Sequence, residues 1–342
     1  MTAALALGGG ALAALVDVPA AWLSGAALVC ALAAILGLPV DVPGRVRTVG
    51  YIALGAALGS GVTPETFAEV GNWGISLAAV CVTVVAVVVS SLLFLSRVAG
   101  WDRASAFFAS VPGALSYVLA MASEDGRADV RRVAVSQTLR LLVLVVVLPP
   151  LIAHGGVAAP EAPVHVESGL RDLLILAAGC ALASLVAMRA RLPAGHLTGP
   201  FFASLVLHAT GVVAGVLPPA VTIPAYACLG AIIGARFAGI RLAEFRAIAG
   251  ASVGAFGVAL AVSVGIALLV SLVTGQPFAL TLVAFAPGAL DAMVVLAFAL
   301  HLDPAYVALH QMLRMLLISF GMPLAVRLLL PSVATDRDTT PH

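Results

Sequence analysis

The sequence predicts an all-α polytopic membrane protein made of two inverted repeats, and three observations lead to this prediction. The chain of 342 residues is 62% hydrophobic and only 10% charged, with a mean hydropathy of +1.15. Its apolar residues gather in runs that suit membrane helices, and several sequence blocks occur twice in the same order. A soluble domain carries about 25% charged residues, so lipid is the expected solvent.

Composition also excludes several classes of partner. All 17 basic residues are arginines and the net charge is +1, without a basic patch or tail, so no nucleic-acid partner is expected. The cysteines lie inside apolar runs without metal-ligand spacing, and the histidines form no zinc motif, so we expect no disulfide, metal or cofactor. These cysteines are Cys30, Cys81, Cys180 and Cys228.

Twelve apolar segments are predicted as helical elements, each near the ~17–25 residues that cross hydrocarbon. The N-terminal segment has no basic region of a signal peptide and recurs later in the chain, so we expect it to be a true span. The segments are 3–17, 20–39, 48–62, 73–96, 104–122, 132–153, 172–188, 196–216, 222–240, 248–274, 278–299 and 305–330.

The two halves of the chain align. Pro19–Gly25 matches Pro193–Gly199, and Tyr51–Gly59 matches Tyr226–Gly234. The tetrapeptide PGAL occurs at 112–115 and again at 287–290. This predicts a first membrane repeat over 1–153, an external linker over 154–171, a second repeat over 172–332 and a disordered cytoplasmic tail over 333–342.

The arginines predict the topology, because arginine in short loops marks the cytoplasmic side. If all twelve segments cross, the loop arginines are divided between the two sides. If the two segments that contain Pro-Gly enter and leave on one side, all fourteen loop arginines share one face. Each half then has five crossings and one broken or re-entrant helix. Five is odd, so the halves are inverted relative to each other, and both termini are cytoplasmic.

A break at each Pro-Gly is physically reasonable. Pro112 and Pro287 lack a backbone donor, and Gly113 and Gly288 tolerate a bend. The freed backbone groups must be buried in protein or line a watery cavity. An ordinary proline kink in a continuous span is the alternative.

Polar residues at membrane depth are candidate functional residues. Gln137 and Arg140 share a helix face, and Gln311 and Arg314 repeat the pattern in the second half, with His310 adjacent. Each arginine lies about nine residues, or roughly 13 Å, into its span. The arginines could bind an anionic substrate or hold a carboxylate ionised. Alternatively, each caps carbonyl groups of a broken helix and is purely structural.

Asp291 is the acidic residue clearly inside the apolar core, and its counterpart in the first half is Ser116. It could be a proton- or cation-coupling carboxylate, or part of a static ion pair with Arg140 or Arg314. Asp129 and Asp303 precede their spans and are predicted as helix caps.

Glycine pairs with GxxxG spacing occur on matched segments. They are predicted to bring helices into close contact, with lining of a substrate path as the alternative. The four positions are Gly55, Gly59, Gly230 and Gly234.

The duplicated Pro-Gly element, followed by a Q-x-x-R helix that ends in proline, resembles the AbrB-type membrane family. The matching stretches are 110–122 with 136–149, and 285–297 with 310–323. Ala114 and Val118 depart from the family's Gly-Gly and Ser-x-Met pattern. Family members carry two labels: a regulator of gene expression and an ammonia monooxygenase. The second fits poorly, because an oxygenase needs clustered metal ligands.

The sequence therefore favours a secondary transporter for a small solute, with an anion as one candidate class, in a bacterial inner membrane. The alternative is a membrane sensor or regulator that acts by protein contact without flux. A membrane enzyme is disfavoured, and a homo-oligomer is compatible with the pattern. The predicted substrate or ion site consists of Pro112, Gly113, Ser116, Gln137, Arg140, Pro287, Gly288, Asp291, His310, Gln311 and Arg314.

Overall fold

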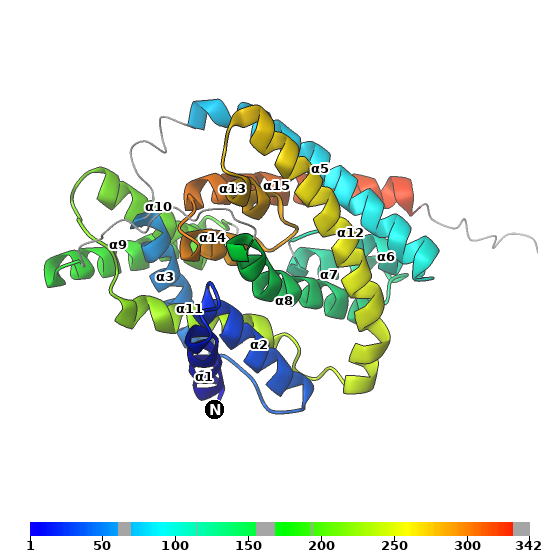
Figure 1. Ribbon diagram of the computed structural model, residues 1–342, viewed down its shortest axis with the longest axis horizontal. Coiled ribbons are helices and arrows are strands. Elements are labelled where there is room, and N and C mark those ends of the chain that lie inside the picture. Colours follow the sequence, from blue (N-terminus) through cyan, green and yellow to red (C-terminus); the bar gives the residue numbers. More distant parts are fainter. Residues whose placement is uncertain (61–69, 114, 155–167, 193, 331–342) are drawn as a thin grey trace, which may run out of the picture.

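The computed structural model describes residues 1–60, 70–113, 115–154, 168–192 and 194–330. Over these residues the chain folds into helices and connecting turns, which confirms the all-α prediction (Figure 1). The predicted linker lies mostly, and the predicted tail entirely, outside the described residues, so their assignments stay predictions.

The helices of the first half are α1 (Thr2–Leu15), α2 (Ala21–Ile35), α3 (Gly44–Ser60), α5 (Gly74–Leu93), α6 (Arg103–Ser110), α7 (Leu115–Asp125) and α8 (Val130–His154). A short turn, η1 (Val70–Trp73), precedes α5, and a π-helical turn, η2 (Phe94–Val98), follows it. The helices of the second half are α9 (Leu170–Arg189), α10 (Gly195–Ala209), α11 (Pro219–Ala235), α12 (Leu242–Thr274), α13 (Phe278–Phe285), α14 (Leu290–Ala299) and α15 (Pro304–Leu329).

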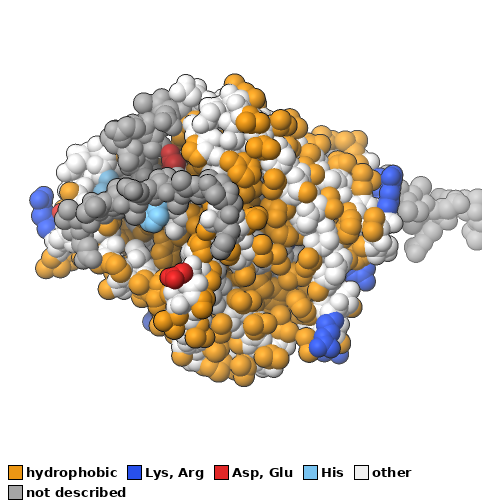
Figure 2. Space-filling model, viewed as in Figure 1, with side chains coloured by type: hydrophobic (Ala, Val, Ile, Leu, Met, Phe, Trp, Pro, Cys, Tyr) orange, Lys and Arg blue, Asp and Glu red, His pale blue; other side chains and the backbone are white. Residues whose placement is uncertain are grey.

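The surface is that of a multi-pass membrane protein. Five helices in the described part of the chain are long and apolar enough to cross a membrane, namely 71–98, 130–153, 170–189, 242–274 and 304–329. Large apolar side chains face outward, as at Phe320, which is 80% exposed. Figure 2 shows hydrophobic side chains over much of one face and arginines mostly at its edges.

Both Pro-Gly segments are interrupted helices, as predicted. The first breaks between α6 and α7, and the second between α13 and α14. Gly113 has a φ of +78°, in the left-handed region that favours glycine. These breaks place backbone polar groups inside the protein.

The helices form two groups that do not coincide with the two halves. The first group contains α1, α2, α3, α9, α10 and α11, and the second contains α5 to α8 and α12 to α15. The groups meet where α8 packs on α2 and α11, and where α14 packs on α3. In Figure 1, α5 and α12 lie side by side, one from each half.

The GxxxG glycines pack as predicted. A Cβ at Gly55 would lie 2.4 Å from the Leu197 carbonyl oxygen, and one at Gly59 would lie 2.5 Å from the Phe201 carbonyl oxygen. Thus α3 rests directly on α10. In the matched arrangement a Cβ at Gly230 of α11 would lie 2.6 Å from the Leu23 carbonyl oxygen of α2.

Helices α3 and α11, which carry the duplicated Tyr-Gly block, pack antiparallel. Residues near the end of α3 and near the start of α11 line one cavity, whereas a Cβ at Gly50 would lie 2.8 Å from Cys228 Sγ. An inverted relation between the halves predicts such a pairing, although the orientation of each half in a membrane stays a prediction.

The predicted caps are also present. Asp303 accepts hydrogen bonds from the backbone N–H groups of Ala305 (2.8 Å) and Tyr306 (3.3 Å) at the start of α15. Asp129 accepts one from Arg132 N–H (3.0 Å) at the start of α8.

Candidate functional site

The two helix interruptions meet inside the protein. A Cβ at Gly113 would lie 3.4 Å from the Gly288 carbonyl oxygen and 4.0 Å from Arg314 Nη2. Pro112, Pro287 and Gly288 are buried. The fold therefore brings together two stretches of irregular backbone that are far apart in the sequence.

In the second half, α15 supplies the groups that satisfy the end of α13. Arg314 Nη1 donates to the Ala286 carbonyl oxygen (2.6 Å), and Nη2 donates to the Gly288 carbonyl oxygen. Gln311 Nε2 donates to the Ala284 carbonyl oxygen (3.1 Å). Gln311 Oε1 accepts from Arg314, so the two side chains hold each other in place.

The first half repeats this arrangement, with longer hydrogen bonds from its arginine. Gln137 Nε2 on α8 donates to the Phe108 carbonyl oxygen (2.8 Å). Arg140 Nη2 donates to the Val111 carbonyl oxygen (3.3 Å) and to Gln137 Oε1 (3.2 Å). The Q-x-x-R spacing works because residues three apart share a helix face. These are the carbonyl contacts that the purely structural alternative expects of the arginines.

Helix-end carbonyls do not balance the charge of two cations. Arg140 is 8% exposed and Arg314 is 6% exposed. In the part of the chain that the structure describes, no Asp or Glu lies within 4.0 Å of either guanidinium. A buried charge is costly without a counter-charge, so this centre is suited to an anion.

Asp291 is bonded to a tyrosine. It lies in the first turn of α14, where a helix N-terminus favours negative charge. Its Oδ2 accepts a hydrogen bond from Tyr51 Oη of α3 (2.9 Å), and its Oδ1 accepts one from Ala292 N–H (2.9 Å). An ion pair with Arg140 or Arg314, the static alternative, is absent among the described ion pairs.

Two candidates have other surroundings. His310 is fully buried; its Nε2 lies 2.8 Å from Ser76 Oγ, and its Nδ1 lies 2.7 Å from the Tyr306 carbonyl oxygen. Its ring stacks on Tyr306 at a centroid distance of 4.0 Å. The hydrogen bonds of His310 thus go to α5 and α15, not to the backbone of a break. Ser116 lies in the first turn of α7, and its side chain is outside the described part.

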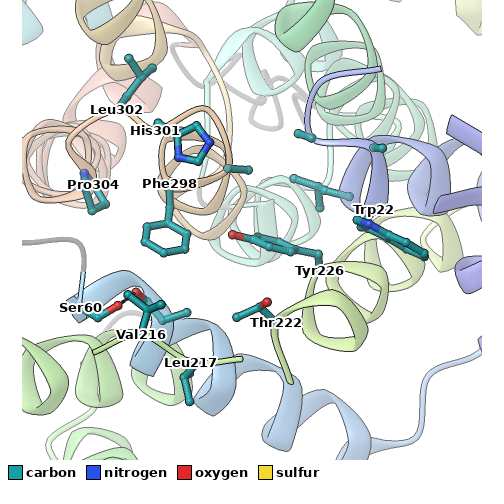
Figure 3. Close-up of a pocket in the computed structure, with 15 residues that line it drawn as sticks. Trp22, Ser60, Val216, Leu217, Thr222, Tyr226, Phe298, His301, Leu302 and Pro304 are labelled. Atoms are coloured by element: carbon teal, nitrogen blue, oxygen red, sulfur yellow. Dashed lines mark hydrogen bonds between the residues drawn. The ribbon is translucent and has the colours of Figure 1, made fainter. Parts of the chain in front are cut away.

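A cavity of about 470 Å³ lies between the ends of α2, α3, α11 and α14 (Figure 3). Its polar lining includes Ser60, Thr222, Tyr226 and His301, and Trp22 and Phe298 add aromatic rings. Helix α14 links this cavity to the breaks, because its first turn holds Asp291 and its last turn holds Phe298 and Ala299.

Sequence reasoning missed Tyr51 and these cavity residues. A signal was present for the tyrosines, since Tyr51 and Tyr226 each begin a copy of the duplicated block. The cavity residues come from four separate helix ends, and no spacing in the sequence links such ends.

Among the described residues, no group of three His, Cys, Asp or Glu side chains could hold a metal ion. The charged and polar groups gathered at the breaks are two arginines, a carboxylate bonded to a tyrosine, and the N-termini of α7 and α14. Helix N-termini and arginines are groups that can hold an anion.

Comparison with known proteins matches most of the chain to one family, whose name describes a regulatory protein. Residues 22–330 match the family described as "Transition state regulatory protein AbrB". A protein of Escherichia coli strain K12 named "Putative regulator AbrB" is 27% identical over 318 residues, covering 91% of this chain and 90% of that protein. "Uncharacterized protein YhjN" of Bacillus subtilis strain 168 is 26% identical, covering 95% of this chain and 91% of that protein. No solved structure matches significantly.

Proposed function

We propose that this chain, which belongs to the AbrB family, is a secondary transporter that carries a small anion across a bacterial inner membrane by alternating access. The observation that carries the proposal is the pair of interrupted helices meeting beside two buried arginines without a carboxylate partner in the described residues. Transporters with inverted repeats bind substrate at such breaks.

An anionic solute follows from the charges. Arg140 and Arg314 bring two positive charges, and Asp291 brings one negative charge that is already bonded to Tyr51. The N-termini of α7 and α14 add partial positive charge at the breaks. A bound anion would supply the counter-charge that the guanidinium groups lack. The arginines would then both cap carbonyl groups and attract the solute.

The helix groups suggest which parts move. The first group is joined to the second through few helix contacts, and the cavity of about 470 Å³ lies between them. Rocking of one group against the other would open the breaks alternately to the two sides. With the arginine-rich loops inside, both termini would be cytoplasmic.

Flux into liposomes tests this function. Purified protein would be reconstituted and challenged with a panel of small anions: acetate, succinate, sulfate and phosphate. We expect protein-dependent uptake of at least one anion, lost in Arg140→Met and Arg314→Met and reduced in Asp291→Asn. Arg246→Met removes an exposed arginine of α12 and is the matched control. If the three site variants carry a demonstrated flux unchanged, the site assignment fails.

A regulator that acts by protein contact is the second candidate, and the name of the Escherichia coli relative favours it. It would use the arginine-rich surface between α11 and α12 to hold a partner. Affinity purification of the wild type beside Arg241→Ala and Arg246→Ala would test it. A partner lost in these variants, without flux, would favour this reading over transport.

A further inference from the structure

Two duplicated tyrosines are in different states in this structure. Tyr51 of α3 and Tyr226 of α11 occupy matched positions in the two halves. Both helices belong to the first helix group and pack antiparallel. If the two repeats had the same conformation and contacts, the two hydroxyl groups would have equivalent partners.

Tyr51 joins the two helix groups. Its hydroxyl donates a hydrogen bond of 2.9 Å to Asp291 Oδ2, so α3 of the first group is fastened to α14 of the second. The bond joins two side chains, so a substitution at either residue removes it. The bond ends beside the break, only three residues after Gly288.

Tyr226 faces the cavity. Figure 3 shows its hydroxyl end directed toward Phe298 and the space below His301. The Tyr226 hydroxyl makes no hydrogen bond to another described residue, whereas the Tyr51 hydroxyl does. A cavity therefore separates the two helix groups at Tyr226, whereas a hydrogen bond joins them at Tyr51.

Helix α3 shows both conditions along its own length. Ala57 and Ser60 line the cavity, whereas Tyr51 lies six residues before Ala57, about 9 Å along the helix axis. A cavity at one end of α3 and a hydrogen bond between the helix groups nearer its other end fit one end state of a rocking motion.

We propose that Tyr51 and Tyr226 are alternating gate residues, one of which fastens the two helix groups while the other lines an open cavity. In the opposite state Tyr51 releases Asp291, the cavity closes, and Tyr226 fastens α11 to the second helix group. This inference rests on the proposed transport function, because only a protein with two access states needs both tyrosines.

Labelling of a cavity cysteine tests the proposal. Ser60→Cys would place a thiol in the cavity wall, and its reaction rate with a charged maleimide would be measured by peptide mass spectrometry in purified protein. Adding Tyr51→Phe removes the fastening and should lower that rate roughly tenfold, because a hydrogen bond to a charged group biases the equilibrium by at least that factor. Asp291→Asn should lower it in the same direction.

Tyr226→Phe is the matched control, since it removes the same hydroxyl from the tyrosine that is unfastened here. It should leave the labelling rate at or above that of Ser60→Cys alone. An unchanged rate in both Tyr51→Phe and Asp291→Asn would overturn the proposal, as would an equal fall in Tyr51→Phe and Tyr226→Phe. The labelling rate can be measured whether or not the protein carries flux. If flux is found but the labelling rate does not change in the Tyr51 and Asp291 variants, the gate proposal alone is refuted. If the labelling rate changes as expected but no anion is carried, the transport proposal alone is refuted.

Discussion

Gly113 and Gly288, which lie 175 positions apart in the sequence, meet where the two interrupted helices approach each other. A methyl group on Gly113 would be 3.4 Å from the Gly288 carbonyl oxygen, which is van der Waals contact. Everything proposed about binding depends on this meeting, because it gathers the free backbone groups of both halves into one place.

Gly113→Ala should destabilise the protein by about 1–2 kcal/mol, because an alanine would have to adopt a left-handed conformation at a φ of +78°. Thermal unfolding in detergent measures the effect as a lower Tm. Gly265→Ala in α12 is the control, since its Cβ would meet nothing within 4 Å. A stable Gly113→Ala protein would show that the first break does not need this backbone shape.

Arg314→Met should destabilise the protein more than Arg140→Met does. Arg314 donates hydrogen bonds to the carbonyl oxygens of both Ala286 (2.6 Å) and Gly288, and each hydrogen bond from a charged donor contributes about 1.5–3 kcal/mol. Arg140 makes only one carbonyl contact among the described residues, and that contact is longer, at 3.3 Å. Removing a buried charge without a carboxylate partner offsets part of the loss in both variants, so the difference in hydrogen bonds decides the order. Denaturant unfolding would compare the two; the reverse order would contradict the assigned roles.

Gly55→Ala and Gly230→Ala should each lower stability by about 1–3 kcal/mol, because the added methyl group would push two helix backbones apart. The Cβ would lie 2.4 Å from the Leu197 carbonyl oxygen in one case and 2.6 Å from the Leu23 carbonyl oxygen in the other. Thermal unfolding would be followed for both variants. Gly250→Ala, whose Cβ has open space, should be neutral or slightly stabilising.

The ion pair at the end of α7 predicts a pH dependence of stability. Arg127 hydrogen-bonds to Asp125 and lowers the pKa of that carboxyl. Because the pKa of Asp125 is lower in the folded state, the ion pair stabilises the fold at pH values above the unfolded pKa near 3.9. This stabilisation is lost as pH falls through the lower pKa of the folded state.

Asp125→Asn should therefore be less stable than the wild type at pH 7, by up to about 1 kcal/mol for a pair at the surface. The difference should shrink as pH falls below about 4. Chemical unfolding at pH 7 and pH 3.5 would measure it. A difference that is independent of pH would assign the effect to packing rather than to charge.

The sequence by itself determined the class of fold and where the helices break. Lipid as solvent follows from composition. Proline followed by glycine favours a break in a helix, because the missing N–H is a local property of the chain. Asp303 before Pro304 likewise specified the start of α15. The Q-x-x-R spacing placed Gln137 beside Arg140 and Gln311 beside Arg314, since residues three apart share a helix face.

Only the tertiary structure decided which distant groups meet. Tyr51 and Asp291 are separated by 240 residues, and their hydrogen bond exists because α3 packs on α14. His310 follows the same helix as Arg314 but points into an aromatic cluster with Tyr306 and Trp73. Periodicity fixes the face of a helix on which a side chain lies, whereas the neighbour of that face depends on how all the helices share one packed interior.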